Sequence, residues 1–240
     1  MKVVRNIRQS INKRISSAKA MASESTAIPS NLKDIDADVP DLQNQLPPAP
    51  ERPSHPNFNV ILPPDDPVYG KWNVFLAGSI EMGNAIQWQK HMYKYLNHLP
   101  ITLCNPRRGR WDPNVTGAAK DAAFNHQVTW ELNALTKSDV VCFFFDTTTK
   151  SPVTMLELGL WAHSGKVVVC CGDTFWKAGN IHIVCERYNI PFVEKFEDLP
   201  ALVVKMLGEK GLEEAAKETA DKESKKTPEG KGDGSEKTKL

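Results

Sequence analysis

The feature that most restricts the fold is a repeated alternation, between residues 71 and 207, of short apolar runs and segments with helical spacing. The apolar runs are predicted strands, at residues 72–78, 101–104, 139–145, 166–171 and 191–195. The predicted helices follow them, at 84–98, 118–137, 154–164, 179–188 and 197–207. Because the strands are continuously apolar, both faces of their sheet are expected to be covered. The pattern therefore predicts an α/β domain, a three-layer sandwich around a five-stranded parallel sheet.

The two ends of the chain differ from this domain in composition. Residues 1–20 are basic and acid-free, with apolar residues at spacings of three and four, which predicts an amphipathic arm. This composition is typical of a mitochondrial presequence, and a short disordered arm is the alternative. Residues 21–70 are rich in proline and polar residues and are interpreted as a linker or wrapping arm. Residues 208–240 are predicted to be a disordered polar tail.

Composition also narrows the partners and the compartment. A net charge of +1 gives no strong attraction to nucleic acid, and no apolar run approaches the ~20 residues that a membrane span needs. The five cysteines form no CxxC pair and lie mostly in apolar runs, which favours reduced core thiols in an intracellular protein. We therefore expect a cytoplasmic location, or a mitochondrial one if residues 1–20 act as a presequence. Common cofactor and zinc motifs are absent, so neither a cofactor nor a metal is expected.

Ligands of such sheets bind beyond the carboxyl ends of the strands, so the residues just after each strand are the candidates. Glu157 follows there, within the second turn of a predicted helix that Ser151 and Pro152 begin. A carboxylate among apolar neighbours should be partnered or have a raised pKa, and at this edge it suits nucleophilic attack on carbon. The alternative is an ordinary surface glutamate. Asp146 ends the central strand, where it either orients a ligand or terminates the strand, and Glu131 alone would count as a surface residue.

Other residues at the same edge are candidates for ligand binding. Gly78 and Ser79 end the first strand, and Asn105 ends the second. Arginine binds phosphate or carboxylate through paired hydrogen bonds, although surface salt bridges explain most arginine clusters. Tryptophan on an edge loop either stacks on a base or closes the rim of the domain. The arginine and tryptophan candidates are Arg107, Arg108, Trp111 and Trp176. Asn180 is a further candidate, either as a ligand contact or as a helix cap.

Several of these segments, taken in order, resemble one known family. They are Phe75–Ser79, Asn105–Arg108, Trp130–Glu131, Ser138–Val141, Ser151–Gly159 and Gly172–Asn180. Together they look like the nucleoside 2-deoxyribosyltransferase-like family, over residues 72–207. The resemblance implies a flavodoxin-like, Rossmann-like sheet, a nucleoside or nucleotide as ligand, and a homo-oligomer.

The resemblance also implies roles for three acidic residues. Glu157 matches the nucleophile that attacks the anomeric carbon of a 2-deoxyribonucleoside and forms a glycosyl-enzyme. Glu131 matches an aspartate near the base and is a candidate proton shuttle. Asp146 would hold the sugar hydroxyls or orient Glu157. This division of labour follows the logic of retaining glycosidases, which use two carboxylates in separate roles.

Two positions depart from the well-known transferases. Ser151 stands where they have an aspartate six residues before the nucleophile, and the first strand offers Val74 and Phe75 where they have a tyrosine. The related N-glycosidases that hydrolyse deoxynucleoside monophosphates carry a serine like Ser151. Three functions therefore stay open: transfer between deoxynucleosides, hydrolysis of deoxynucleotides, and non-catalytic binding of a nucleotide-like ligand.

Overall fold

The computed structural model describes residues 46–81, 85–107 and 116–226. Its strands form a single sheet whose members are β1 (Asn59–Ile61), β2 (Asn73–Gly78), β3 (Thr102–Cys104), β4 (Val140–Phe145), β5 (Val167–Cys171) and β6 (Phe192–Val193). The α-helices are α3 (Trp88–Leu96), α4 (Ala122–Lys137), α5 (Pro152–Trp161), α6 (Ala178–Arg187), α7 (Leu199–Glu209) and α8 (Glu213–Lys226). The predicted strands and helices all occur, with shifts of a few residues at their ends.

The order of the strands decides where a ligand can bind. All neighbours are parallel, in the order β1-β3-β2-β4-β5-β6. From β2 the chain first moves to β3 on one side, and α4 then carries it back across β2 to β4 on the other side. The direction of winding therefore reverses between β2 and β4, which pair from Val74 opposite Val140 to Gly78 opposite Phe144. This reversal opens a crevice beyond the carboxyl ends of these two strands.

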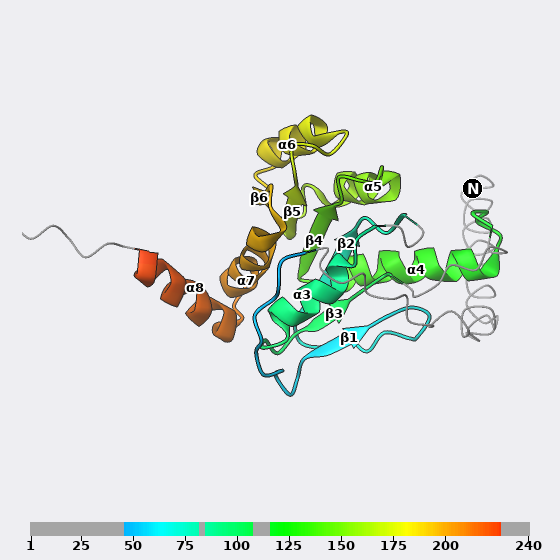
Figure 1. Cartoon of the computed structure of the whole chain (residues 1–240). Coiled ribbons are helices and arrows are strands. Elements are labelled where there is room, and N and C mark those ends of the chain that lie inside the picture. The colour runs from blue at the N-terminus through cyan, green and yellow to red at the C-terminus, as the bar shows by residue number, and fades with distance from the viewer. Residues whose placement is uncertain (1–45, 82–84, 108–115, 227–240) are drawn as a thin grey trace, which may run out of the picture.

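Helices cover both faces of the sheet, as the continuously apolar strands predicted (Figure 1). One core contains Trp88 and Met92 of α3 and Val203 of α7, packed against alternate residues of the strands. The other contains Trp130 of α4 and Leu158 of α5, together with apolar residues of α6. The domain is therefore a three-layer α/β sandwich, with α3 and α7 on one face and α4, α5 and α6 on the other.

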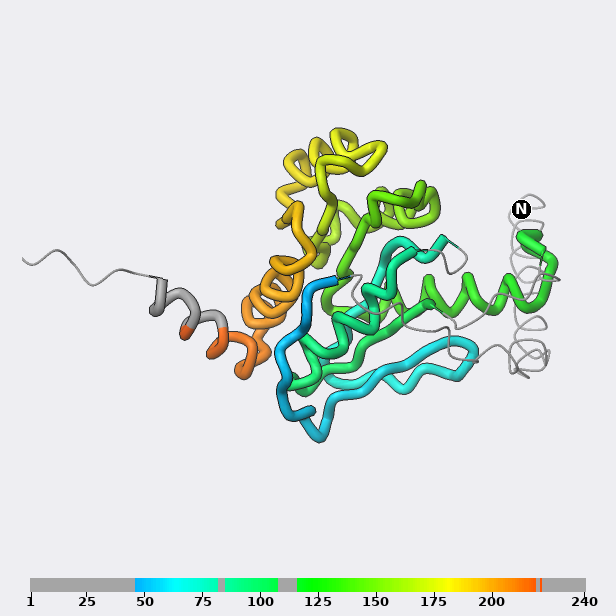
Figure 2. Tube along the Cα trace, in the orientation of Figure 1, coloured from blue at the N-terminus to red at the C-terminus, as the bar shows by residue number. Residues whose placement is uncertain are grey.

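The sheet has six strands, one more than predicted. The additional strand, β1, pairs with β3 from Asn59 opposite Thr102 to Ile61 opposite Cys104. Figure 2 shows the segment from residue 46, blue to cyan, leading into the sheet beside β3. A three-residue edge strand that is only partly buried carries too short a pattern to separate it from the proline-rich segment around it. The part of residues 21–70 that contains β1 is thus paired with the sheet.

The chain beyond residue 208 also differs from the prediction, because a helix stands where a disordered tail was expected. Leu212 and Ala215 are buried against α7 at the start of α8. A Cβ on Gly208 would lie 2.9 Å from the backbone of Ala216, so the two helices approach closely there. Small residues make this contact, and they leave no strong apolar periodicity in a sequence of lysine and glutamate.

The cysteines lie in the core as free thiols, as predicted. Burial raises the pKa of Cys104, Cys170, Cys171 and Cys185 to about 12, so these thiols stay protonated at neutral pH. In the described part of the chain, no helix has the length and apolar character to cross a membrane. The same residues contain no cluster of three or more histidine, cysteine or acidic side chains arranged for a metal ion.

Candidate active site

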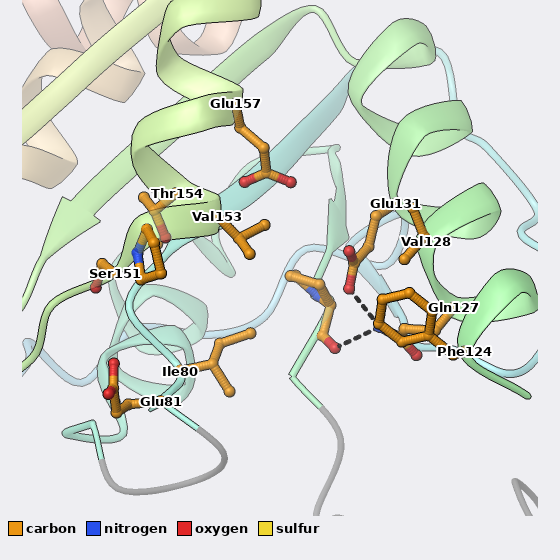
Figure 3. Close-up of a pocket in the computed structure, with 13 residues that line it drawn as sticks. Ile80, Glu81, Phe124, Gln127, Val128, Glu131, Ser151, Val153, Thr154 and Glu157 are labelled. Atoms are coloured by element: carbon orange, nitrogen blue, oxygen red, sulfur yellow. Dashed lines mark hydrogen bonds between the residues drawn. The ribbon is translucent and has the colours of Figure 1, made fainter. Parts of the chain in front are cut away.

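A cavity of about 340 Å³ lies at the carboxyl edge of the sheet, where the winding reverses. The ends of β2 and β3, the middle of α4 and the first half of α5 surround it (Figure 3). Its walls are mostly apolar, with three acidic residues and a few other polar groups. The residues that line it are Gly78, Ile80, Glu81, Pro106, Phe124, Gln127, Val128, Glu131, Ser151, Pro152, Val153, Thr154 and Glu157.

Two acidic residues from different helices reach into the space between α4 and α5. Figure 3 shows Glu157 descending from α5 and Glu131 from α4. Helical packing places both: Leu158 of α5 and Trp130 of α4 are buried against the sheet, so the neighbouring glutamates lie at the cavity side. Two carboxylates that face one space can divide the roles of nucleophile and proton carrier, provided that their protonation states differ.

The surroundings of the two carboxylates do differ. The Glu157 side chain is partly exposed to the cavity but otherwise enclosed by protein, and this burial raises its pKa to about 8. The negative charge of Glu131 raises the pKa of Glu157 further. Among the described residues, no hydrogen bond reaches Glu157, whereas Glu131 accepts one of 2.5 Å from Gln127 Nε2. In the empty site at neutral pH, Glu157 therefore holds a proton. This agrees with the expectation from the sequence that a carboxylate without a partner has a raised pKa.

Ser151 occupies the N-cap position of α5 but does not cap the helix. Its backbone is left-handed, with φ of 48°, which is uncommon for a residue other than glycine. The hydroxyl instead lies 2.6 Å from Ser79 Oγ and 2.7 Å from Thr149 Oγ1. Three buried hydroxyls thus meet at the end of the crevice, and Ser151 is the one that lines the cavity. Ser151 thus begins the helix as predicted, but its side chain does not cap the helix.

Asp146 and Arg107 both bind the segment at Ala85 and Ile86, which is not part of the cavity lining. Asp146 accepts hydrogen bonds from the backbone N–H of Ile86 at 2.9 Å and from the backbone and hydroxyl of Thr148. Arg107 donates to the carbonyls of Ala85 and Ile86, both at 2.7 Å. The two side chains therefore fix one segment of chain from the ends of two strands. Neither is among the residues that line the cavity.

Asn105 holds the turn around Pro106, which lines the cavity. Its Oδ1 accepts a hydrogen bond from the backbone N–H of Arg107, and its Nδ2 donates to the hydroxyl of Tyr93. Gly78 lies at the floor, where a Cβ would fall 2.5 Å from Phe144 O and 2.6 Å from the ring of Trp88. No side chain fits there, so this glycine allows β2, β4 and α3 to meet directly beneath the cavity.

The remaining predicted contacts lie away from the cavity or outside the described residues. Trp176 is 53% exposed, and its ring N–H donates to the carbonyl of Lys150. Asn180 is exposed on α6. Arg108 and Trp111 fall outside the described residues. Of the predicted residues, the cavity wall thus brings together Gly78, Glu131, Ser151 and Glu157.

Sequence reasoning missed several residues that line the cavity or lie next to its lining. Gln127 and Phe124 precede Glu131 by four and seven positions on the same helix, so helical spacing from Glu131 identifies both. Thr149 follows the strand end at Asp146 and is visible only as one of three consecutive threonines. Its importance depends on Ser79, which is distant in sequence.

With this geometry established, the chain can be compared with known families. Residues 71–175 match the family described as nucleoside 2-deoxyribosyltransferase like. This part of the chain is therefore similar to the nucleoside 2-deoxyribosyltransferase-like family. The matched residues include Glu131, Asp146, Ser151 and Glu157, whereas Trp176 and Asn180 follow the match.

Other comparisons add less. A crystal structure of a conserved protein from Enterococcus faecalis V583 is similar, at 14% sequence identity and a TM-score of 0.40. The similarity covers 57% of this chain and 99% of that chain. No curated protein matches the sequence. The similarity to the nucleoside 2-deoxyribosyltransferase-like family thus rests on the family match, and the cavity lies within the same segment.

Proposed function

We propose that this protein cleaves the N-glycosidic bond of 2-deoxyribonucleosides and transfers the deoxyribosyl group to a second base through a covalent Glu157 intermediate. The observation that carries the proposal is the pair of carboxylates, one on each of two helices, facing a largely apolar cavity at the reversal of the sheet. Similarity to the family supports the same class of reaction. A cavity of about 340 Å³ is at the lower end of the range for small-molecule sites, which suits a ligand of nucleoside size.

The reaction uses the single proton that the empty pair holds. Glu157 passes this proton to Glu131, either directly or through water, and becomes an anion. Its oxygen attacks C1′ of the sugar while the bond from C1′ to the base nitrogen breaks, and the electron pair leaves with the base. Glu131 gives the proton to that nitrogen. A second base then attacks C1′ and displaces Glu157, and its surplus proton returns to the pair.

A second candidate function is hydrolysis of deoxynucleoside monophosphates, in which water replaces the second base. The specific observation in its favour is Ser151, a neutral hydroxyl at the cavity in place of a carboxylate. A carboxylate there would repel a phosphate, and a hydroxyl can donate a hydrogen bond to it. The Arg107 guanidinium adds no support, because it donates to the backbone carbonyls of Ala85 and Ile86.

One assay separates these functions from non-catalytic binding. The protein is incubated with deoxynucleosides or deoxynucleoside monophosphates, with and without an acceptor base, and free base is followed by chromatography. Release that requires an acceptor indicates a transferase, and release into water indicates a hydrolase. If no base is released while a ligand raises the melting temperature, the protein is a binding module and the proposed function is wrong.

We expect Glu157→Ala to reduce base release by at least about a thousandfold, because the covalent route is lost, while the fold persists. Glu186→Ala is the matched control, since it removes an exposed glutamate on α6 away from the cavity. Circular dichroism checks the fold of both variants. A Glu157→Ala protein as active as the wild type would rule out the nucleophile assignment.

We also propose a homo-oligomer. The support is an exposed apolar stripe on α5, formed by Val153, Leu156 and Leu160, which are 60%, 62% and 52% exposed. These side chains flank Glu157 on the helix that borders the cavity. A second copy that covers this stripe would also exclude water from the edge of the site.

A further inference from the structure

We propose that Gln127 is a positioning residue that holds Glu131 at the cavity and keeps the negative charge of the facing carboxylates on Glu131 while the cavity is empty. Gln127 lies one helical turn before Glu131 on α4 and is only 3% exposed. The inference deepens the proposed function, and its role in turnover rests on that function. The protonation of the empty site does not depend on any substrate.

The orientation of the Gln127 amide is settled by its two acceptors. Nε2 donates to the carbonyl of Pro106 at 3.1 Å and to Glu131 Oε1 at 2.5 Å. A flipped amide would place its oxygen against a carbonyl oxygen and a carboxylate oxygen, with no proton between either pair. The amide oxygen, in turn, has no partner within the described residues. The side chain is therefore held by its donor end, and toward Glu131 it acts only as a donor.

A buried donor that can only donate favours the charged form of the carboxylate it contacts. Glu157, on the other side of the cavity, receives no such donor among the described residues. Gln127 thus makes the surroundings of the two glutamates unequal. Glu131 has a fixed N–H partner, whereas Glu157 has apolar surroundings. The negative charge settles on Glu131, and the proton stays on Glu157.

The carbonyl of Pro106 makes this arrangement rigid. Pro106 follows β3, whereas Gln127 and Glu131 belong to α4, so the hydrogen bond ties the helix to the end of a neighbouring strand. Both Pro106 and Gln127 line the cavity. Glu131 is therefore positioned relative to the sheet edge, where the ligand binds, and not only relative to its own helix.

The test measures protonation directly in the full-length protein without a substrate. Side-chain carboxyl carbons of glutamate are labelled with ¹³C and titrated by NMR, with Glu157→Gln and Glu131→Gln used to assign the two signals. In the wild type, the Glu157 signal should titrate near pH 8. In Gln127→Met, which keeps the volume but removes the donor, Glu131 gains proton affinity, so the Glu157 signal should lose about a tenth or more of its step near pH 8 and the Glu131 signal should gain it. The proton is then shared with Glu131.

A double-mutant cycle separates positioning from packing. If Gln127 acts through Glu131, then Gln127→Met should leave the Glu157 step unchanged in the Glu131→Gln background. Asn133→Met, an exposed amide on the same helix, is the control and should leave the step unchanged in either background. An equal change of the Glu157 step with and without Glu131, or an unchanged step in the folded single variant, would overturn the proposal. Gln127→Asn, whose amide is one methylene shorter, is the second variant if the Met protein does not fold, with the same redistribution of the step expected.

Turnover then distinguishes this inference from the proposed function. Base release by the wild type should decline as the pH rises through about 8, because the pair loses the proton that the leaving base needs. In Gln127→Met this decline should not move to lower pH, because a proton that the two carboxylates share is lost at the same or a higher pH. Base release should instead fall at every pH, because Glu131 is no longer held at the cavity. A changed NMR step in Gln127→Met together with wild-type base release that does not decline above pH 8 would overturn the proposed use of this proton and would leave the role of Gln127 established.

Discussion

At the scale of the residue, the raised pKa of Glu157 makes protein stability depend on pH. The pKa is about 8 in the folded protein and 4.5 for an unperturbed glutamate. Between these values the folded state holds a proton that the unfolded state has lost, so the free energy of unfolding falls as the pH rises from 4.5 to 8. Glutamine cannot ionise and avoids this loss.

We therefore expect the free energy of unfolding of Glu157→Gln to rise, relative to that of the wild type, between pH 5 and pH 9. The expected rise is roughly 2 kcal/mol after allowance for solvent at the cavity. Urea denaturation at the two pH values measures the difference. A stability difference that is the same at both pH values would show that Glu157 carries its charge in the folded protein without penalty.

Gly78 is a second position where one residue decides the structure. We expect Gly78→Ala to destabilise the protein by about 3 kcal/mol. The distances from the new methyl group to Phe144 O and to the Trp88 ring would be about half an ångström shorter than any normal contact distance. Gly159→Ala is the matched control: its Cβ meets nothing within 4 Å, and alanine should stabilise α5 slightly. Urea midpoints of the two variants test this, and similar values for both would contradict the packing account.

At the scale of the element, the attachment of α8 to α7 depends on contacts between small residues. Gly208 lets α7 approach α8, and in the middle of α8 Glu218 pairs with Arg52 at 3.3 Å and with His98 Nε2 at 2.6 Å. These pairs are partly exposed and contribute little stability. The packing of Leu212 and Ala215, which the close approach at Gly208 permits, therefore contributes most of the attachment.

We expect Gly208→Val to detach α8 while the sheet stays folded, since the added side chain meets the backbone of Ala216 rather than a flexible group. Trypsin should then cut at Lys217 several times faster than in the wild type. Gly179→Ala on α6, where a Cβ meets nothing within 4 Å, should leave the cleavage rate unchanged. Equal cleavage of Gly208→Val and wild type would show that α8 is held by other contacts.

At the scale of the whole molecule, the exposed stripe on α5 predicts how copies associate. We expect the wild type to sediment as an oligomer and the double variant Leu156→Glu, Leu160→Glu to sediment as a monomer, because charged side chains cannot be buried unpaired at an interface. Ile183→Glu changes an equally exposed apolar residue on α6 and should sediment like the wild type. A wild type that stays monomeric at all concentrations would refute the homo-oligomer.

Much of the fold followed from local sequence. Continuous apolar runs and helical spacing are read over a few residues, and they predicted a parallel sheet with helices on both faces. The short strand β1 and the helix α8 were not predicted, because a three-residue edge strand and a contact between small residues leave no periodic pattern in the sequence. The candidate nucleophile Glu157 was also identified from its position beyond a strand and from resemblance.

Local patterns in the chain predicted the class of fold, the edge where chemistry is expected, and the acidic residues available there. Which of those residues share a cavity, and how their charges differ, depends on packing between segments distant in sequence. Glu131 and Glu157 lie on separate helices, and Gln127 gives a donor to one of them alone. Protonation depends on burial and on neighbours distant in sequence, which is why the choice between a partnered Glu157 and a raised pKa, and the role of Gln127, required the assembled site.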